Sequence, residues 1–201
     1  MSNSWDERFK EEDYIYGVEP NAWVREVFNE EGNLNMALLA EGEGRNAVYL
    51  AKLGHEVTTF DYSSEGIEKT KRLAASKGVE VTTNLQDLTI GDALPREAYD
   101  VSVNVFGHVP KEGKAAMFSN MINCVKPGGR IIFELYSKRQ LEFKTGGPPN
   151  PEMLYAVDEI KNYLGEFPVE IIRLEEVITE RQEGRMHQGK SAVIQGDIKK
   201  M

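Results

Sequence analysis

The chain has 201 residues, which is enough for one well-buried domain and too few for two of ordinary size. A composition of 40% hydrophobic and 28% charged residues is typical of a globular protein and excludes a disordered one. The net charge of −9 argues against nucleic acid as a main partner, because phosphates bind to positively charged surfaces. No segment approaches about 18 consecutive apolar residues. We therefore expect no membrane span, no signal peptide and a cytoplasmic protein.

The single cysteine, Cys124, excludes an internal disulfide and a cysteine-based metal cluster, which fits a reducing compartment. The histidines lack the close spacing of a metal-binding pair, so the sequence predicts no metal site. We expect a small molecule as the partner. We also expect a monomer or a weak homodimer, since an exposed edge strand is the only sign of pairing.

Residues 1–33 predict a helical lid over the rest of the chain. Within it, residues 4–12 and 20–30 are typical of two short helices. An aromatic loop with Tyr14 and Tyr16 lies between them. Both tyrosines suit a lid or a substrate wall, although simple packing fits them nearly as well. We take Tyr14 as a substrate contact and Tyr16 as a catalytic candidate.

A glycine-rich turn at residues 40–44 follows an apolar run at residues 36–39. The run is too short for a helix and suits a buried parallel strand. A helical pattern then begins at Ala47 and stops at Gly54. A strand, a glycine turn and a helix in this order predict a nucleotide-binding site. Glycines allow a ligand close to the backbone, and the first N–H groups of the helix point at it.

Asp61 ends the next predicted strand, residues 55–60, within reach of a ribose bound over the glycine turn. The pattern fits NAD as well as other nucleoside ligands. Charge separates them, because Glu41 and Glu43 disfavour a pyrophosphate. S-adenosylmethionine has no phosphate and carries a sulfonium and an ammonium against one carboxylate, so it tolerates nearby acids. The turn therefore favours S-adenosylmethionine, with Arg45 offsetting part of the acidity and NAD as the alternative.

Strands and helices alternate over residues 36–136, which predicts a parallel, doubly wound sheet with helices on both faces. After Asp61 the predicted elements are helices at 64–77 and 112–125 and strands at 79–83, 99–105 and 130–136. Asp87 follows the third strand and His108 follows the fourth. Both lie at the edge where an open α/β sheet binds its ligands.

The last third of the chain differs from the core. A helix at 157–164 precedes two extended runs, 169–181 and 189–198, which predict an antiparallel hairpin at the edge of the sheet. Three basic or titratable residues lie near its turn: Arg181, Arg185 and His187. They would hold an anionic acceptor if the turn folds over the site. We favour the alternative, a solvated basic turn, because charge clusters are usually exposed.

With these elements placed, the chain resembles the class I S-adenosylmethionine-dependent methyltransferases. The matching elements are Glu41-Gly42-Glu43-Gly44, Asp61, Asp87-Leu88, Phe106-Gly107-His108 and Lys126-Pro127-Gly128-Gly129. More narrowly, it resembles the small tellurite-resistance/thiopurine-methyltransferase-like branch. The motifs are Trp5-Asp6-Glu7-Arg8-Phe9, Tyr16-Gly17-Val18-Glu19-Pro20-Asn21, Gly42-Glu43-Gly44-Arg45-Asn46-Ala47 and Thr145-Gly146-Gly147-Pro148-Pro149.

The resemblance implies an α/β, Rossmann-like fold: a doubly wound, seven-stranded, mostly parallel sheet with a C-terminal antiparallel hairpin and helices on both faces. It also implies one methyltransferase domain over residues 1–201. Its parts are the helical lid at 1–33, the cofactor-binding core at 34–136, and a C-terminal helix and hairpin at 137–201.

The resemblance further implies the residues that bind the cofactor. Those beside the methionine are Ala40, Glu41, Gly42, Gly44 and Asn46. Those beside the adenosine are Asp61 on the ribose hydroxyls, Tyr62, Ser63, Asp87 and Leu88. Val105 and Phe106 line the methyl-donor end. The family usually has an acid where this chain has Leu38 and a glycine where it has Ala40, so we expect Glu41 to take over the work of that acid.

Methyl transfer from a sulfonium is an in-line displacement, and the protein mainly aligns the acceptor and excludes water. A general base is needed only for an acceptor that is protonated at neutral pH, and His108 is the best-placed candidate. The alternative for His108 is a capping or packing role in its loop. We therefore expect methyl transfer to a small-molecule acceptor. The alternatives are an NAD-type oxidoreductase and a protein that binds S-adenosylmethionine or S-adenosylhomocysteine without turnover.

Overall fold

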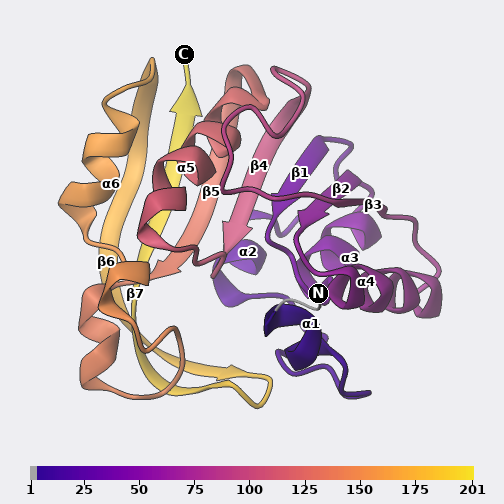
Figure 1. Cartoon of the computed structure of the whole chain (residues 1–201). Coiled ribbons are helices and arrows are strands. Elements are labelled where there is room, and N and C mark those ends of the chain that lie inside the picture. Colours follow the sequence, from indigo (N-terminus) through magenta and orange to yellow (C-terminus); the bar gives the residue numbers. More distant parts are fainter. Residues whose placement is uncertain (1–3) are drawn as a thin grey trace.

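Seven strands of the computed structural model form one sheet in the order β3-β2-β1-β4-β5-β7-β6, and the structure describes residues 4–201 (Figure 1). The strands are β1 (Asn35–Leu39), β2 (Glu56–Asp61), β3 (Thr82–Leu85), β4 (Tyr99–Val105), β5 (Val125–Tyr136), β6 (Val169–Glu183) and β7 (His187–Lys200). The first five strands pair in parallel, while β7 is antiparallel to both β5 and β6. The Rossmann-like fold with a C-terminal antiparallel hairpin is confirmed.

The helices are α1 (Ser4–Phe9), α2 (Ala22–Val27), α3 (Arg45–Lys52), α4 (Ser64–Ser76), α5 (Lys114–Asn123) and α6 (Val157–Leu164). Short 3-10 helices lie at Lys111–Gly113, Lys138–Glu142 and Pro151–Met153. Among residues 4–201, no helix combines the length and apolar character that crossing a membrane requires. The first three residues of the predicted lid lie outside this range.

The central strand β1 explains why helices are needed on both faces. Ala37 and Leu39 pack in a core cluster with residues of α5 and α6, whereas Met36 and Leu38 pack in a second cluster with residues of α2 and α3. Successive side chains of a strand point to opposite faces, so an uninterrupted apolar run requires burial on both. The sequence of β1 has this pattern.

Several predicted boundaries differ from the structure, among them the end of the first helix, at Phe9, and the start of β5, at Val125. The second helix begins at Ala22 instead of Pro20, because Asn21 is its N-cap and accepts a hydrogen bond from Val24 N at 3.1 Å. The third strand begins at Thr82, since the residues before it still bond to the end of α4. The first strand of the hairpin ends at Glu183 and the second begins at residue 187, so the turn between them is shorter than predicted.

Parallel pairing brings the carboxyl ends of β1, β2 and β4 together. Leu39, the last residue of β1, lies opposite Phe60 in β2 and Asn104 in β4. The loops that follow these strands therefore meet at one edge of the sheet, as expected for the ligand-binding edge of an open α/β fold.

Candidate active site

The turn between β1 and α3 uses left-handed backbone at Ala40, Gly42 and Gly44, with φ of 55°, 61° and 90°. At Gly44 the turn also lies against α4: a Cβ there would approach Thr70 Oγ1 to 2.7 Å. Only glycine fits such a position without displacing the neighbouring helix. Ala40 is tied to β2 by a hydrogen bond from its N–H to Phe60 O at 2.8 Å. The turn is therefore fixed on both sides before any ligand binds.

Glu41 caps helix α3. Its carboxylate accepts a hydrogen bond from Ala47 N at 2.8 Å, while the formal N-cap, Gly44, has no side chain to do so. Burial raises the pKa of Glu41 to about 7, although the bonds to Ala47 N and the nearby Arg45 act in the opposite direction. The N-terminus of α3, where a pyrophosphate would bind, is therefore occupied by a carboxylate of the protein itself.

Asp61 holds the glycine turn against the start of α4. Its two oxygens accept hydrogen bonds from Gly42 N and Ser63 N, each at 2.8 Å. Burial raises the pKa of Asp61, and these backbone bonds partly oppose the rise. An ionised carboxylate has about four acceptor positions, so Asp61 retains capacity for ribose hydroxyls.

The predicted adenosine contacts differ in how much surface they offer. Tyr62 is 55% exposed at the end of β2, whereas Leu88 is buried within the core cluster beneath α5. Asp87 Oδ1 accepts hydrogen bonds from the N–H and the hydroxyl of Thr89, at 2.9 and 2.6 Å. These bonds fix one carboxylate oxygen of Asp87 at the carboxyl end of β3. Tyr62 and Asp87 thus follow the neighbouring strands β2 and β3, and their contacts to an adenosine stay a prediction.

Ser63 and Asn46, both predicted to contact the cofactor, connect structural elements. Ser63 Oγ accepts from Gly66 N at 3.1 Å as the N-cap of α4 and donates to Asp6 Oδ1 at 2.7 Å. Asn46 Oδ1 accepts from Asn21 N at 2.8 Å, which joins α3 to the start of α2. Their side chains are occupied by these bonds.

Glu43 is an anchor for the N-terminal segment. Its carboxylate pairs with Lys69 Nζ at 2.7 Å, and both side chains are 2% exposed. It also accepts hydrogen bonds from Ile15 N and Tyr16 N, each at 3.2 Å. The sequence argument counted Glu43 among the acids that disfavour a pyrophosphate, but the charge of Glu43 is compensated within the protein by Lys69. Lys69 was missed, since a lysine in a helix is usually exposed.

Four rings meet at the end of β4, and we call them the aromatic cluster: Tyr16, Phe106, Tyr136 and His187. Phe106 follows β4 with φ of 56° and stacks on Tyr136 with 4.4 Å between ring centroids. The centroid of His187 lies 4.7 Å from those of Phe106 and Tyr16. Val105, the other residue predicted at the methyl-donor end, packs instead against the core beneath α2 and α3.

The Gly146–Gly147 pair of the last family motif closes over this cluster. A Cβ on Gly146 would lie 3.2 Å from both the Tyr136 hydroxyl and the His187 ring. A Cβ on Gly147 would lie 3.0 Å from the Tyr136 ring, and both glycines have positive φ. The motif is therefore explained by close packing of a backbone loop on aromatic side chains.

Beside the aromatic cluster lies a buried charge cluster of two arginines and two glutamates: Arg45, Glu134, Arg181 and Glu183. Arg181 pairs with Glu134 and, at 2.8 Å, with Glu183, which in turn pairs with Arg45 at 2.8 Å. Arg181 is 3% exposed, so the solvated basic turn that we favoured is wrong for this residue. Glu134 could not be singled out from the sequence, because its partner Arg181 lies 47 residues away in the chain. Glu183 lies two residues from Arg181, but its second partner, Arg45, is distant in the chain.

His108 is buried with both ring nitrogens occupied. Its Nδ1 lies 2.8 Å from Met153 O, to which it donates, and its Nε2 accepts from Tyr136 N at 3.1 Å. Burial lowers its pKa to about 4, so the ring is neutral. A general base needs a free lone pair, and in this structure His108 has none. The base predicted at His108 is corrected to a structural residue, which was its alternative.

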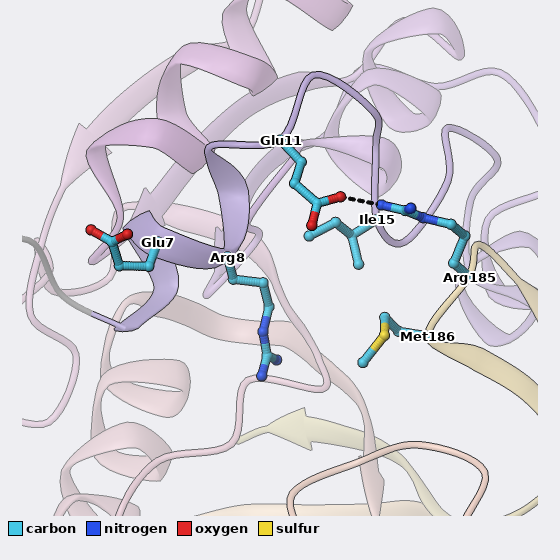
Figure 2. Close-up of a pocket in the computed structure, with 6 residues that line it drawn as sticks. All are labelled: Glu7, Arg8, Glu11, Ile15, Arg185 and Met186. Carbon is cyan, nitrogen blue, oxygen red and sulfur yellow. Dashed lines mark hydrogen bonds and ion pairs between the residues drawn. The ribbon is translucent and has the colours of Figure 1, made fainter.

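The two remaining predicted substrate residues, Tyr14 and Arg185, lie outside the aromatic cluster. Tyr14 donates its hydroxyl to Lys69 O at 3.1 Å and packs against α4. Arg185 is exposed and pairs with Glu11. Figure 2 shows this pair bridging the N-terminal loop and the hairpin tip. Beside the pair lies a surface hollow of about 530 Å³. The hollow is lined by Glu7, Arg8, Glu11, Ile15, Arg185 and Met186.

Comparisons with known proteins agree with this geometry. Residues 38–129 match the family described as "Methyltransferase domain". The chain is 26% identical over 125 residues to the probable S-adenosyl-L-methionine-dependent methyltransferase TehB of Haemophilus influenzae. This match covers 61% of the chain and 42% of TehB, so it spans less than half of the relative's length.

Solved structures share the fold. The crystal structure of TehB from Haemophilus influenzae has a TM-score of 0.67 at 20% identity, over 88% of this chain and 60% of that one. A structure concerning the conversion of a disulfide bond into a thioacetal group during echinomycin biosynthesis has a TM-score of 0.76 at 16% identity, over 98% and 90%. The structure of magnesium protoporphyrin IX methyltransferase from Synechocystis PCC 6803 with bound SAH has a TM-score of 0.65 at 17% identity, over 84% of this chain and 74% of that one.

Proposed function

We propose that the chain is a class I S-adenosylmethionine-dependent methyltransferase similar to TehB, and that it transfers a methyl group to a small-molecule acceptor. The observation that carries the proposal is the pairing of the glycine turn with Asp61. Asp61 Oδ2 accepts from Gly42 N at 2.8 Å at the carboxyl end of β2. A carboxylate beside the glycine turn is what a ribose bound over that turn requires, and this supports the proposal.

The residues present fit S-adenosylmethionine. Asp61 and Asp87 stand at the ends of the neighbouring strands β2 and β3, with spare acceptor positions for the ribose and the adenine amino group. The half-exposed ring of Tyr62 offers a face for the adenine. Leu38 is fully buried and apolar, so it cannot supply the acid that the family usually has at this position. Glu41, in the glycine turn, is the carboxylate that would take over its work.

The same turn disfavours a dinucleotide. A pyrophosphate binds to free N–H groups at a helix N-terminus. Here Ala47 N at the start of α3 already donates to Glu41 at 2.8 Å. A ligand without phosphates avoids both the loss of this cap and the repulsion between anions. The oxidoreductase alternative therefore fits the structure less well than methyl transfer.

When bound, S-adenosylmethionine supplies an activated methyl group: the bond from carbon to the acceptor forms as the S–CH₃ bond breaks, leaving a neutral thioether. The residues of the chain position the acceptor and exclude water. Glu43 ties Ile15 N and Tyr16 N to the glycine turn, so the N-terminal segment lies across it. Phe106 directs its ring toward Tyr136 and His187, which form an apolar wall beside the end of β4.

A surface hollow on the outer side of this wall offers an approach for a small acceptor. The hollow of Figure 2 has a volume of about 530 Å³, and Ile15 and Met186 line it together with four charged residues. Its lining includes none of the four rings of the aromatic cluster. The N-terminal loop and the hairpin tip also bond to each other, from Arg185 N to Ile15 O at 2.9 Å, which narrows the approach.

Calorimetric titration of the purified protein with S-adenosylmethionine, S-adenosylhomocysteine and NAD tests the proposal. We expect the first two to bind at micromolar concentration and NAD not to bind. Release of S-adenosylhomocysteine in the presence of an acceptor panel then tests turnover. Binding of NAD alone would reject methyl transfer, and cofactor binding without turnover of any acceptor would favour the non-catalytic alternative.

A further inference from the structure

His187 differs from the other histidine at this edge of the sheet. His108 uses both ring nitrogens in bonds to the backbone, whereas His187 Nδ1 is buried without a hydrogen-bond partner. The whole side chain of His187 is 5% exposed. Buried polar atoms in native proteins almost always have a partner, so an unpartnered one at a ligand-binding edge indicates a group that binds there.

The surroundings of His187 are those of a binding site. Its ring lies between Phe106, at the end of β4, and Tyr16, in the N-terminal segment, at 4.7 Å from each centroid. The hydroxyl of Tyr136 is a second buried atom without a hydrogen-bond partner, and it faces the same Gly146 position as the His187 ring. Two hydrogen-bonding atoms thus lie among aromatic walls.

The charged side chains around His187 compensate one another. In the charge cluster, two arginines face two glutamates, and each arginine is paired. Glu43 and Lys69 form a further closed pair beneath Tyr16. On the outer side, Arg8 Nη1 donates to the Tyr16 hydroxyl at 3.1 Å, in a hollow that also contains Glu7, Glu11 and Arg185. Among residues 4–201, no buried positive charge beside His187 is left without a carboxylate partner, which argues against the anionic acceptor that the sequence analysis kept as its less favoured reading.

We propose that Nδ1 of His187 hydrogen-bonds the methyl acceptor, and that this acceptor is an uncharged molecule with an O–H, N–H or S–H group on an apolar or aromatic body. The inference rests on the proposed methyl transfer. Methylation of such a group forms the bond from carbon to the heteroatom and releases its proton, which passes to water. Burial, followed by the nearby Arg45, lowers the pKa of His187 to about 3, so the ring stays neutral and accepts the hydrogen bond without keeping the proton.

Two substitutions separate the hydrogen bond from packing. His187→Phe keeps an aromatic ring among Tyr16, Phe106 and Tyr136 but removes the nitrogen. His187→Gln keeps a hydrogen-bonding side chain of similar length. We expect both variants to bind S-adenosylhomocysteine within about twofold of the wild type, because no predicted cofactor residue is changed. This titration tests cofactor binding independently of the acceptor, so a failure of the proposed function at its cofactor is distinguished from a failure of the acceptor proposal.

The acceptor is probed with matched pairs on protein saturated with S-adenosylhomocysteine. The uncharged members are benzyl mercaptan, 4-methylphenol and aniline, and the anionic members are 4-(mercaptomethyl)benzoate, 4-hydroxyphenylacetate and 4-aminobenzoate. We expect an uncharged member to bind at least about tenfold more tightly than its anionic partner, and about tenfold more weakly to His187→Phe, with His187→Gln within about threefold of the wild type.

Nitrogen NMR of the imidazoles provides a direct readout, since the chain has only three histidines. On addition of the bound uncharged probe, the Nδ1 resonance of His187 should shift, while that of His55, at the opposite edge of the sheet, should not. Preference for the anionic probes, equal binding to His187→Phe, or no binding of any uncharged probe would each overturn the proposal.

Discussion

The buried pair of Glu43 and Lys69 should contribute strongly to stability. Substitution Lys69→Met keeps most of the apolar volume of the side chain but leaves Glu43 buried with only the N–H groups of Ile15 and Tyr16 as partners. It also removes the hydrogen bond from Lys69 Nζ to Asp13 O at 2.7 Å. Removing one partner of a buried ion pair costs about 3–5 kcal/mol, because the other charge is left uncompensated.

Urea unfolding at pH 7 measures the effect. We expect Lys69→Met to lower the free energy of unfolding by at least about 3 kcal/mol, and the double variant Glu43→Gln/Lys69→Met to recover a large part of the loss. Lys71→Met is the matched control. It breaks an exposed pair with Glu68 on the same helix and should change stability by less than about 0.5 kcal/mol. A loss below about 1 kcal/mol in Lys69→Met, or no recovery in the double variant, would refute the reasoning.

Three further predictions concern the site. Asp61→Asn should weaken S-adenosylhomocysteine binding at least about tenfold in calorimetry, whereas Asp100→Asn, which also removes a carboxylate bonded to backbone N–H but at the opposite edge, should not. The pKa of Glu41 is raised from 4.5 to about 7, so the stability that Glu41 contributes is lost as pH rises between these values. The free energy of unfolding of Glu41→Gln, measured with urea, should not show this loss. An equal loss in the variant and the wild type would refute the reasoning. His108→Phe should destabilise the protein by about 2 kcal/mol without changing the shape of the pH–rate profile, and loss of the acidic limb of that profile would restore His108 as the base.

The fold could be predicted because its signals are local. The run Met36–Leu39 is apolar at every position, as burial on both faces requires, and the glycine turn after it has a composition that few other structures need. Alternation of such strands with helical patterns then leaves few topologies. Boundaries were less predictable. Helix α2 begins after its N-cap Asn21 and not at Pro20, because the side chain of Asn21 accepts a hydrogen bond that depends on the final geometry.

The site was predictable in position but less so in the roles of its residues. A sequence shows that His108 follows a strand, but not that Met153 O and Tyr136 N take both of its nitrogens. It equally shows Arg181 near a hairpin turn, but not its pairing with Glu134, which lies 47 residues earlier. Such partners are set by the tertiary structure, and the pairing decides whether a titratable group is available for chemistry.

The acids of the glycine turn connect these results. Glu41 caps α3 through Ala47 N, and Glu43 fixes the N-terminal segment through Ile15 N and the ion pair to Lys69. Each task requires a carboxylate at its position, but only Glu41 disfavours a pyrophosphate, because Lys69 compensates the charge of Glu43. Any movement of the N-terminal segment away from the turn must break the bonds of Glu43 while its charge remains buried. Stability of this segment and access to the glycine turn therefore depend on the same carboxylate, and Lys69→Met should increase proteolysis before residue 20 as well as global unfolding.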